Sequence, residues 1–146
     1  MTRLTPHFTL EEFTFSQTAD RYGIDNTPGQ DELDNLQITA RGMEVVRSIL
    51  DNNIIHINSG FRCLPLNTRL GSSKNSFHCR GLAADFTSRA FNTPYHIVDT
   101  LVRSDLDFDK VIWEYGSWVH LQFQKNPLDN RREALIIDKK GVRFWK

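Results

Sequence analysis

Apolar residues recur at steps of three and four over residues 30–52, the pattern of a helix that turns one face to a core. A second helix is predicted to begin at Pro94, because proline suits the first helical turn and apolar residues follow it at helical spacing. Near the N-terminus, Thr9 is followed three residues later by Glu12. This capping-box pattern predicts a short helix there.

Apolar and polar residues alternate over residues 82–87 and again over residues 119–124, which is typical of half-buried strands. Asp85 and His120 lie on the polar side of these two segments. If the two strands are neighbours, both side chains project from the same open face of a sheet.

The remaining strands are predicted from β-branched residues and turn signals. Residues 54–57 are rich in isoleucine and run into a turn at Gly60. Residues 110–115 and 118–123 are predicted to form a hairpin, and residues 134–145 a second one. The segments predicted as loops from their composition are residues 16–19, 25–29, 64–75 and the acidic, solvated 105–109.

Together these elements predict a single α+β domain over residues 1–146, with a small, mainly antiparallel sheet flanked by helices. Lysine plus arginine and aspartate plus glutamate both number 18, so no general attraction to nucleic acid or an anionic membrane is expected. No apolar run approaches the ~18 residues of a membrane span, so no membrane insertion is expected either. We expect a monomer.

Three side chains suit a metal ion. His78, Asp85 and His120 offer imidazole and carboxylate ligands, and a catalytic zinc site takes three such ligands and leaves a fourth position for water. This set would lie on the sheet, with His78 reaching in from the loop before Gly81. Two alternatives stay open. The histidines could be core residues beside an unrelated surface aspartate, or Cys79 could add a sulfur ligand.

These residues also carry a family resemblance. The pattern Ser76-x-His-x-x-Gly-x-Ala-x-Asp85, preceded by Ser59-Gly-Phe-Arg62 and followed by Trp118-x-His120, resembles the zinc D-alanyl-D-alanine carboxypeptidase family. That family includes phage endolysin peptidases and is similar in fold to the hedgehog signalling domain. The resemblance spans roughly residues 8–123 and leaves out the predicted C-terminal hairpin at 133–146.

The resemblance implies roles for individual residues. It implies that His78, Asp85 and His120 bind one zinc ion per chain. It implies that Arg62 lies at the active-site cleft and contacts substrate, a role that suits the fixed donors of a guanidinium. It implies that Ser76 binds substrate near the metal.

Peptide hydrolysis also needs a group that takes a proton from water and passes it to the leaving amine. Some relatives carry an acid three residues before the last histidine, where this chain has Ser117. Glu114, six residues before His120, is the nearest alternative and the predicted general base. Its structural alternative is a surface or salt-bridged carboxylate. His56 could lie beneath the cleft as a supporting residue.

The function implied by the resemblance is that of a zinc metallopeptidase that hydrolyses peptidoglycan stem peptides or cross-links, as in phage or prophage lysis. Two alternatives are a zinc-containing module that only binds the cell wall or a virion, and a hydrolase of another amide. The N-terminal residues lack the apolar segment of a signal peptide. We therefore expect a protein made in the cytoplasm that reaches the periplasm or cell wall through a holin-type pore or within a virion.

Overall fold

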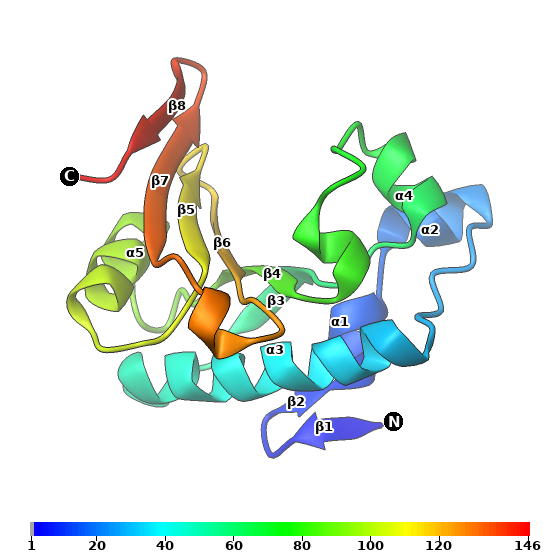
Figure 1. Ribbon diagram of the computed structural model, residues 1–146, viewed down its shortest axis with the longest axis horizontal. Helices are drawn as coiled ribbons and strands as arrows, with labels where there is room; N and C mark the ends of the chain where they lie inside the picture. The colour runs from blue at the N-terminus through cyan, green and yellow to red at the C-terminus, as the bar shows by residue number, and fades with distance from the viewer. Residues whose placement is uncertain (1) are drawn as a thin grey trace.

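A computed structural model describes residues 2–146 as one domain built around a six-stranded sheet (Figure 1). The strands lie in the order β3-β4-β6-β5-β7-β8, and every neighbouring pair is antiparallel except β5 and β7, which are parallel. Their bounds are β3 His56–Ser59, β4 Ala83–Thr87, β5 Lys110–Glu114, β6 Trp118–Gln122, β7 Glu133–Asp138 and β8 Gly141–Phe144. The predicted α+β fold with a mainly antiparallel sheet is confirmed.

Helices cover one face of this sheet and leave the other open. The long helix α3 (Gln30–Ile49) runs beneath the sheet, and α5 (Pro94–Arg103) lies beside it (Figure 1). The core combines apolar residues of α3 and α5 with the inward-facing residues of the strands, among them Phe86 and Leu121. Because side chains alternate along a strand, the neighbours of these two residues point to the open face.

Helix capping explains where the predicted helices begin. Thr9 caps α1 (Leu10–Thr14), and Glu12 returns a hydrogen bond to the Thr9 backbone, which is the predicted capping box. Thr93 caps α5, and Pro94 occupies its first turn. The helix predicted over residues 30–52 ends earlier, at Ile49, because the chain then turns through a positive φ at Asp51.

Two segments predicted as loops contain short helices. Ser16 caps α2 (Gln17–Tyr22) through a hydrogen bond from the Ala19 amide, and α4 (Leu64–Arg69) begins with a proline in its first turn. Polar and proline-rich composition was the basis for the loop prediction, yet both features also start helices. The remaining elements are β1 (Arg3–Thr5), β2 (Phe8–Thr9) and the 3-10 helices η1 (Phe77–Arg80) and η2 (Pro127–Asp129).

Over residues 2–146, no helix combines the length and apolar character that a membrane span requires. The longest, α3, carries charged residues along its exposed side.

Candidate metal centre

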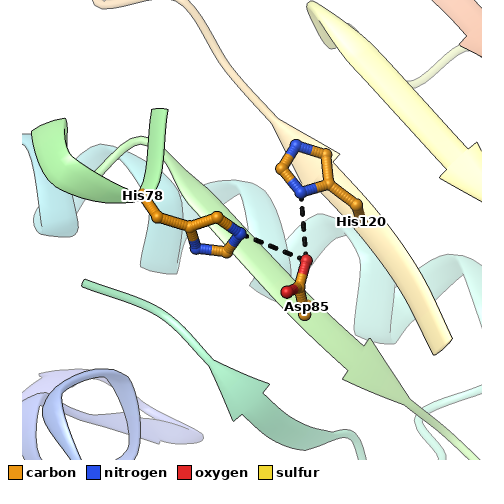
Figure 2. A group of neighbouring side chains, drawn as sticks. All are labelled: His78, Asp85 and His120. Atoms are coloured by element: carbon orange, nitrogen blue, oxygen red, sulfur yellow. Dashed lines mark hydrogen bonds and ion pairs between the residues drawn. The ribbon is translucent and has the colours of Figure 1, made fainter. Parts of the chain in front are cut away.

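Asp85 and His120 are direct partners on neighbouring strands. In the antiparallel register of β4 and β6, Asp85 pairs with His120, so both side chains project from the open face of the sheet. Asp85 Oδ1 lies 3.0 Å from His120 Nδ1 (Figure 2). The alternation in the sequence predicted this shared face.

His78 reaches the same point from η1, where Figure 2 shows its ring directed at Asp85. Its Nε2 lies 3.2 Å from Asp85 Oδ1. The helix η1 is fastened to α3, because Asn35 donates a hydrogen bond to the Arg80 carbonyl and Thr39 donates one to the Gly81 carbonyl. No local pattern in residues 30–49 indicates this contact of α3.

Gly81 makes this attachment possible. Its φ is +76°, and a Cβ there would lie 2.7 Å from the backbone oxygen of Glu32. Any other residue would be strained in this conformation and would push η1 away from α3. The glycine of the sequence pattern therefore allows η1, which carries His78, to pack closely against α3.

Hydrogen bonds fix the tautomer of each histidine. His78 Nδ1 lies 2.7 Å from the Gly60 carbonyl, which can only accept, so Nδ1 carries the hydrogen. His120 Nε2 lies 2.7 Å from Gln122 Oε1. The Gln122 amide nitrogen donates to Asp109 Oδ2 at 2.8 Å, which leaves its oxygen facing His120 and assigns the hydrogen to Nε2.

In the neutral form of each ring, the lone pairs of His78 Nε2 and His120 Nδ1 therefore both face Asp85 Oδ1. Three acceptors that converge on one point repel one another unless a proton or a metal ion lies between them. Together the three residues offer ligand atoms that all lie within 4.8 Å of one another. Ligands about 2.0–2.1 Å from a tetrahedral zinc ion would be roughly 3.3 Å apart, so the arrangement fits this metal.

Cys79 does not belong to this group of ligands, although it follows His78 directly. It is a free thiol, as is Cys63. Burial raises the pKa of Cys79, which disfavours the thiolate form that binds metals. The set of three ligands is the one that the geometry supports.

The buried ligands strongly affect one another's ionisation. Burial works against the Asp85 carboxylate, but when no metal is bound protonated His78 and His120 can donate to it. Their charge and hydrogen bonds then hold the Asp85 pKa well below its usual range. Burial lowers the pKa of His78. Burial also works against the His120 imidazolium, but the hydrogen bond and charge of Asp85 outweigh it and raise the pKa of His120. A divalent metal bound here would keep the carboxylate ionised and would take the place of the protons on the two imidazole nitrogens that face it.

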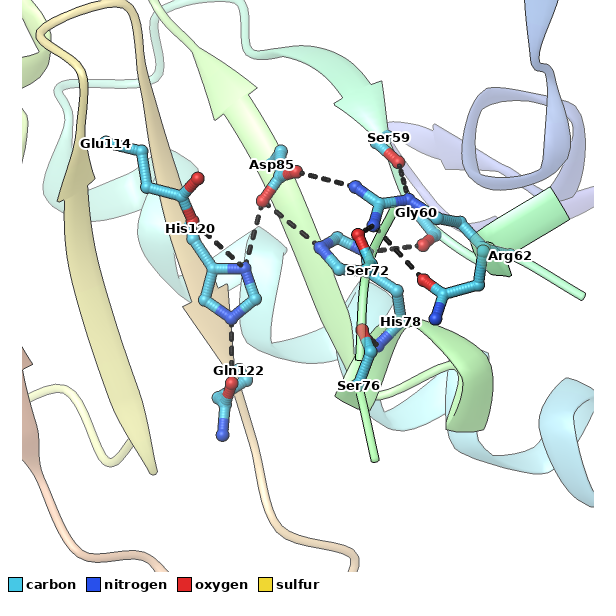
Figure 3. A network of polar contacts seen from close by, with 11 residues as sticks. Ser59, Gly60, Arg62, Ser72, Ser76, His78, Asp85, Glu114, His120 and Gln122 are labelled. Atoms are coloured by element: carbon cyan, nitrogen blue, oxygen red, sulfur yellow. Dashed lines mark hydrogen bonds and ion pairs between the residues drawn. The ribbon is translucent and has the colours of Figure 1, made fainter. Parts of the chain in front are cut away.

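Arg62 lies at the edge of the centre, with nearly all of its donors engaged (Figure 3). Nη2 donates to Asp85 Oδ2 at 3.2 Å, and Nε donates to Ser59 Oγ at 2.9 Å. Nη1 donates to the side-chain oxygens of Asn67 and Ser72. Arg62 therefore holds the second oxygen of Asp85 and directs the first toward the histidines.

Glu114 lies at the end of β5, and Figure 3 shows its carboxylate directed toward His120. Oε1 is 4.0 Å from His120 Nδ1. Burial raises the pKa of Glu114, and the nearby Asp85 charge adds to this effect. The turn after Glu114 bends the chain sharply, with positive φ at Tyr115 and Gly116. Ser117 is exposed and donates to the Tyr115 carbonyl of the same turn.

Ser76 and His56 occupy different positions relative to the ligands. Ser76 precedes η1, and its Oγ accepts a hydrogen bond from the His78 amide at 3.1 Å. Its hydroxyl hydrogen remains able to donate. His56 is exposed on β3 and lies outside the ligand group, as do His7, which pairs with Glu44, and His96, which contacts Thr93.

Two clefts of about 560 Å³ each meet at the centre. Arg62, Leu70, Asp85 and Trp118 line both of them. The first extends from there over β3 to Phe15 and the start of α2, and the second contains the ligands, Glu114 and Ile137 of β7.

A centre of two histidines and an aspartate on an open sheet face, with a carboxylate beside it, defines a candidate metallopeptidase site. Comparison with protein families gives a match over residues 6–122 to the family described as peptidase M15, and the chain belongs to that family. Peptidase M15 proteins are zinc-dependent, so family and geometry together support a zinc-dependent peptidase. No curated protein matches the chain.

Proposed function

We propose that this protein is a zinc peptidase that hydrolyses peptide bonds in peptidoglycan stem peptides or cross-links. The observation that carries the proposal is the convergence of three metal-ligand lone pairs beside Glu114, in a chain of the peptidase M15 family. Zinc held by His78, Asp85 and His120 supplies a Lewis acid that polarises the peptide carbonyl and favours ionisation of water.

Glu114 acts as the general base. Its carboxylate borders the point where the ligands converge and accepts one proton from the attacking water, whose oxygen forms a bond to the carbonyl carbon. When the carbon–nitrogen bond breaks, Glu114 returns that proton to the leaving amine. Burial raises the pKa of Glu114, which favours the protonated carboxyl group that this second step needs.

Arg62 and Ser76 position the reacting groups. Arg62 fixes the orientation of Asp85, and the one hydrogen of Nη2 that has no partner in the described structure is free to donate to a substrate carbonyl. Ser76 orients η1 through the His78 amide and can donate its hydroxyl hydrogen to the substrate. Both residues line the cleft that contains the ligands.

A lytic role in a phage or prophage is the biological setting that the resemblance to endolysin peptidases supports. The test is digestion of purified sacculi with zinc-loaded protein, followed by mass spectrometry of the muropeptides. We expect new amino and carboxyl ends within the peptides, which chelation abolishes. Sacculi that bind the zinc-loaded protein but remain intact would overturn the proposal and favour a binding module.

A further inference from the structure

The metal centre lies in the middle of an extended groove rather than at the end of a pocket. The two clefts share Arg62, Leu70, Asp85 and Trp118, so each continues from the centre in its own direction. One passes over the edge strand β3 toward Phe15, and the other crosses β6 and β5 to Ile137 of β7. A peptide bond at the centre would therefore have space for further residues on both sides.

The groove also lacks a cation suited to a terminal carboxylate. Among residues 2–146, the only lysine or arginine that lines either cleft is Arg62. An arginine frequently recognises a carboxylate with two parallel N–H donors of its guanidinium. Nε and Nη1 of Arg62 already donate to Ser59, Asn67 and Ser72, and one Nη2 hydrogen is used by Asp85. The remaining hydrogen suits the single oxygen of a peptide carbonyl.

Exposed apolar side chains line the cleft that passes over β3, as expected of a peptide-binding surface. Phe15 is 64% exposed and Leu70 is 46% exposed, and both lie along this cleft. Exposed apolar side chains that line a groove can cover an extended chain, because their burial on binding is favourable. The residues of this cleft would contact substrate at positions distant from the cleaved bond.

From these observations we infer that the enzyme is an endopeptidase, which cuts an internal amide of a peptide that occupies both clefts. The inference rests on the proposed function and specifies which bonds that function reaches. Such cleavage requires neither a free C-terminus on the substrate nor release of a single terminal residue.

The test compares a pair of stem-type peptides that differ only at the C-terminus, which is a free carboxylate in one and a carboxamide in the other. Zinc-loaded protein should cut both at similar rates, and mass spectrometry should find at least two residues in each fragment. Release of one C-terminal residue would overturn the inference, as would a roughly 10- to 100-fold slower reaction of the amide, the loss expected for a charge-assisted hydrogen bond. In either case the proposed function would still stand. If neither the peptides nor the sacculi were cut, both the inference and the proposed function would fail.

A matched pair of variants tests the cleft beyond β3. Phe15→Ala should lower kcat/KM for sacculus-derived peptides roughly fivefold or more, because one exposed aromatic contact is lost. Phe144→Ala removes a phenylalanine that is 76% exposed on β8 and lies in neither cleft, and it should leave kcat/KM unchanged. Equal values for the two variants would show that substrate does not extend along this cleft.

Discussion

Gln122 determines which nitrogen of the neutral His120 ring carries the hydrogen. Its amide oxygen lies 2.7 Å from His120 Nε2, and its amide nitrogen is held by Asp109, so the hydrogen of His120 stays on Nε2. The lone pair of Nδ1 is thereby presented to Asp85 and to a metal ion. The same amide connects the centre to the ion pair between buried Asp109 and half-exposed Arg131.

Replacement of Gln122 should therefore weaken zinc binding without removing a ligand. Gln122→Ala leaves His120 Nε2 without its acceptor and should lower zinc affinity by about 10- to 100-fold. Titration against a competing chelator measures the change. Gln30→Ala, at the exposed start of α3, is the control and should bind zinc like the wild type. Equal affinities of the two variants would rule out a role for Gln122 in orienting His120.

Zinc binding should require each of the predicted ligands. Elemental analysis of protein purified without chelator should find one zinc ion per chain. His78→Ala and His120→Ala should each lose the zinc ion, because each variant keeps only two of the three protein ligands that a catalytic zinc site uses. His96→Ala changes an exposed histidine outside the ligand group and should keep the metal. Full zinc content in both ligand variants would place the metal elsewhere.

Removal of zinc should not unfold the domain. The strands that carry Asp85 and His120 are paired with each other, and β4 is also paired with β3. Phe86 and Leu121 anchor these strands in the apolar core. Chelation should therefore leave the far-UV circular dichroism intact and lower the melting temperature only through loss of bound ligand. Loss of the dichroism signal on chelation would instead make the metal structural.

The ion pair of Asp109 should make stability depend on pH. Burial works against the ionised Asp109 carboxyl, but hydrogen bonds from Arg131 and Gln122 outweigh it and hold its pKa well below the usual range. The stabilisation is complete above the ordinary aspartate pKa of about 3.9, and it is lost as pH falls toward the lower folded-state pKa.

Asp109→Asn should therefore reduce the free energy of unfolding by on the order of 2 kcal/mol at pH 7, as expected for lost hydrogen bonds to a buried charge. The difference from the wild type should shrink below about pH 4, where Asp109 of the unfolded wild type begins to protonate while the folded form stays ionised. Urea unfolding of zinc-free protein measures both values. A difference that stays constant down to pH 3 would contradict a stabilising charge at Asp109.

Local patterns predicted the part of the site that lies on regular strands. Alternation placed Asp85 and His120 on one face, and the capping box at Thr9 predicted α1, because both features depend on residues close in sequence. The supporting residues depend on tertiary contacts. Asn35 and Thr39 hold η1 from a distant helix, which no local pattern indicates.

Asp109 is a second case in which a tertiary contact decides the environment of a residue. The prediction of a solvated acidic loop at residues 105–109 was wrong for this residue, whose side chain is fully buried. Arg131 approaches from a later segment of the chain and supplies the counter-charge that permits this burial. Composition alone cannot show such a partner.

The most direct test of the catalytic centre is the turnover number of Glu114→Gln on peptidoglycan peptides, measured together with its zinc content. Glutamine keeps the size of the side chain but cannot accept the proton, so turnover should fall by about 10²–10⁴-fold while zinc content stays at one per chain. Glu133→Gln, on β7 in a pair with Lys110, is the control and should retain turnover. Near wild-type turnover of Glu114→Gln would contradict the account and move the search for the base to His56.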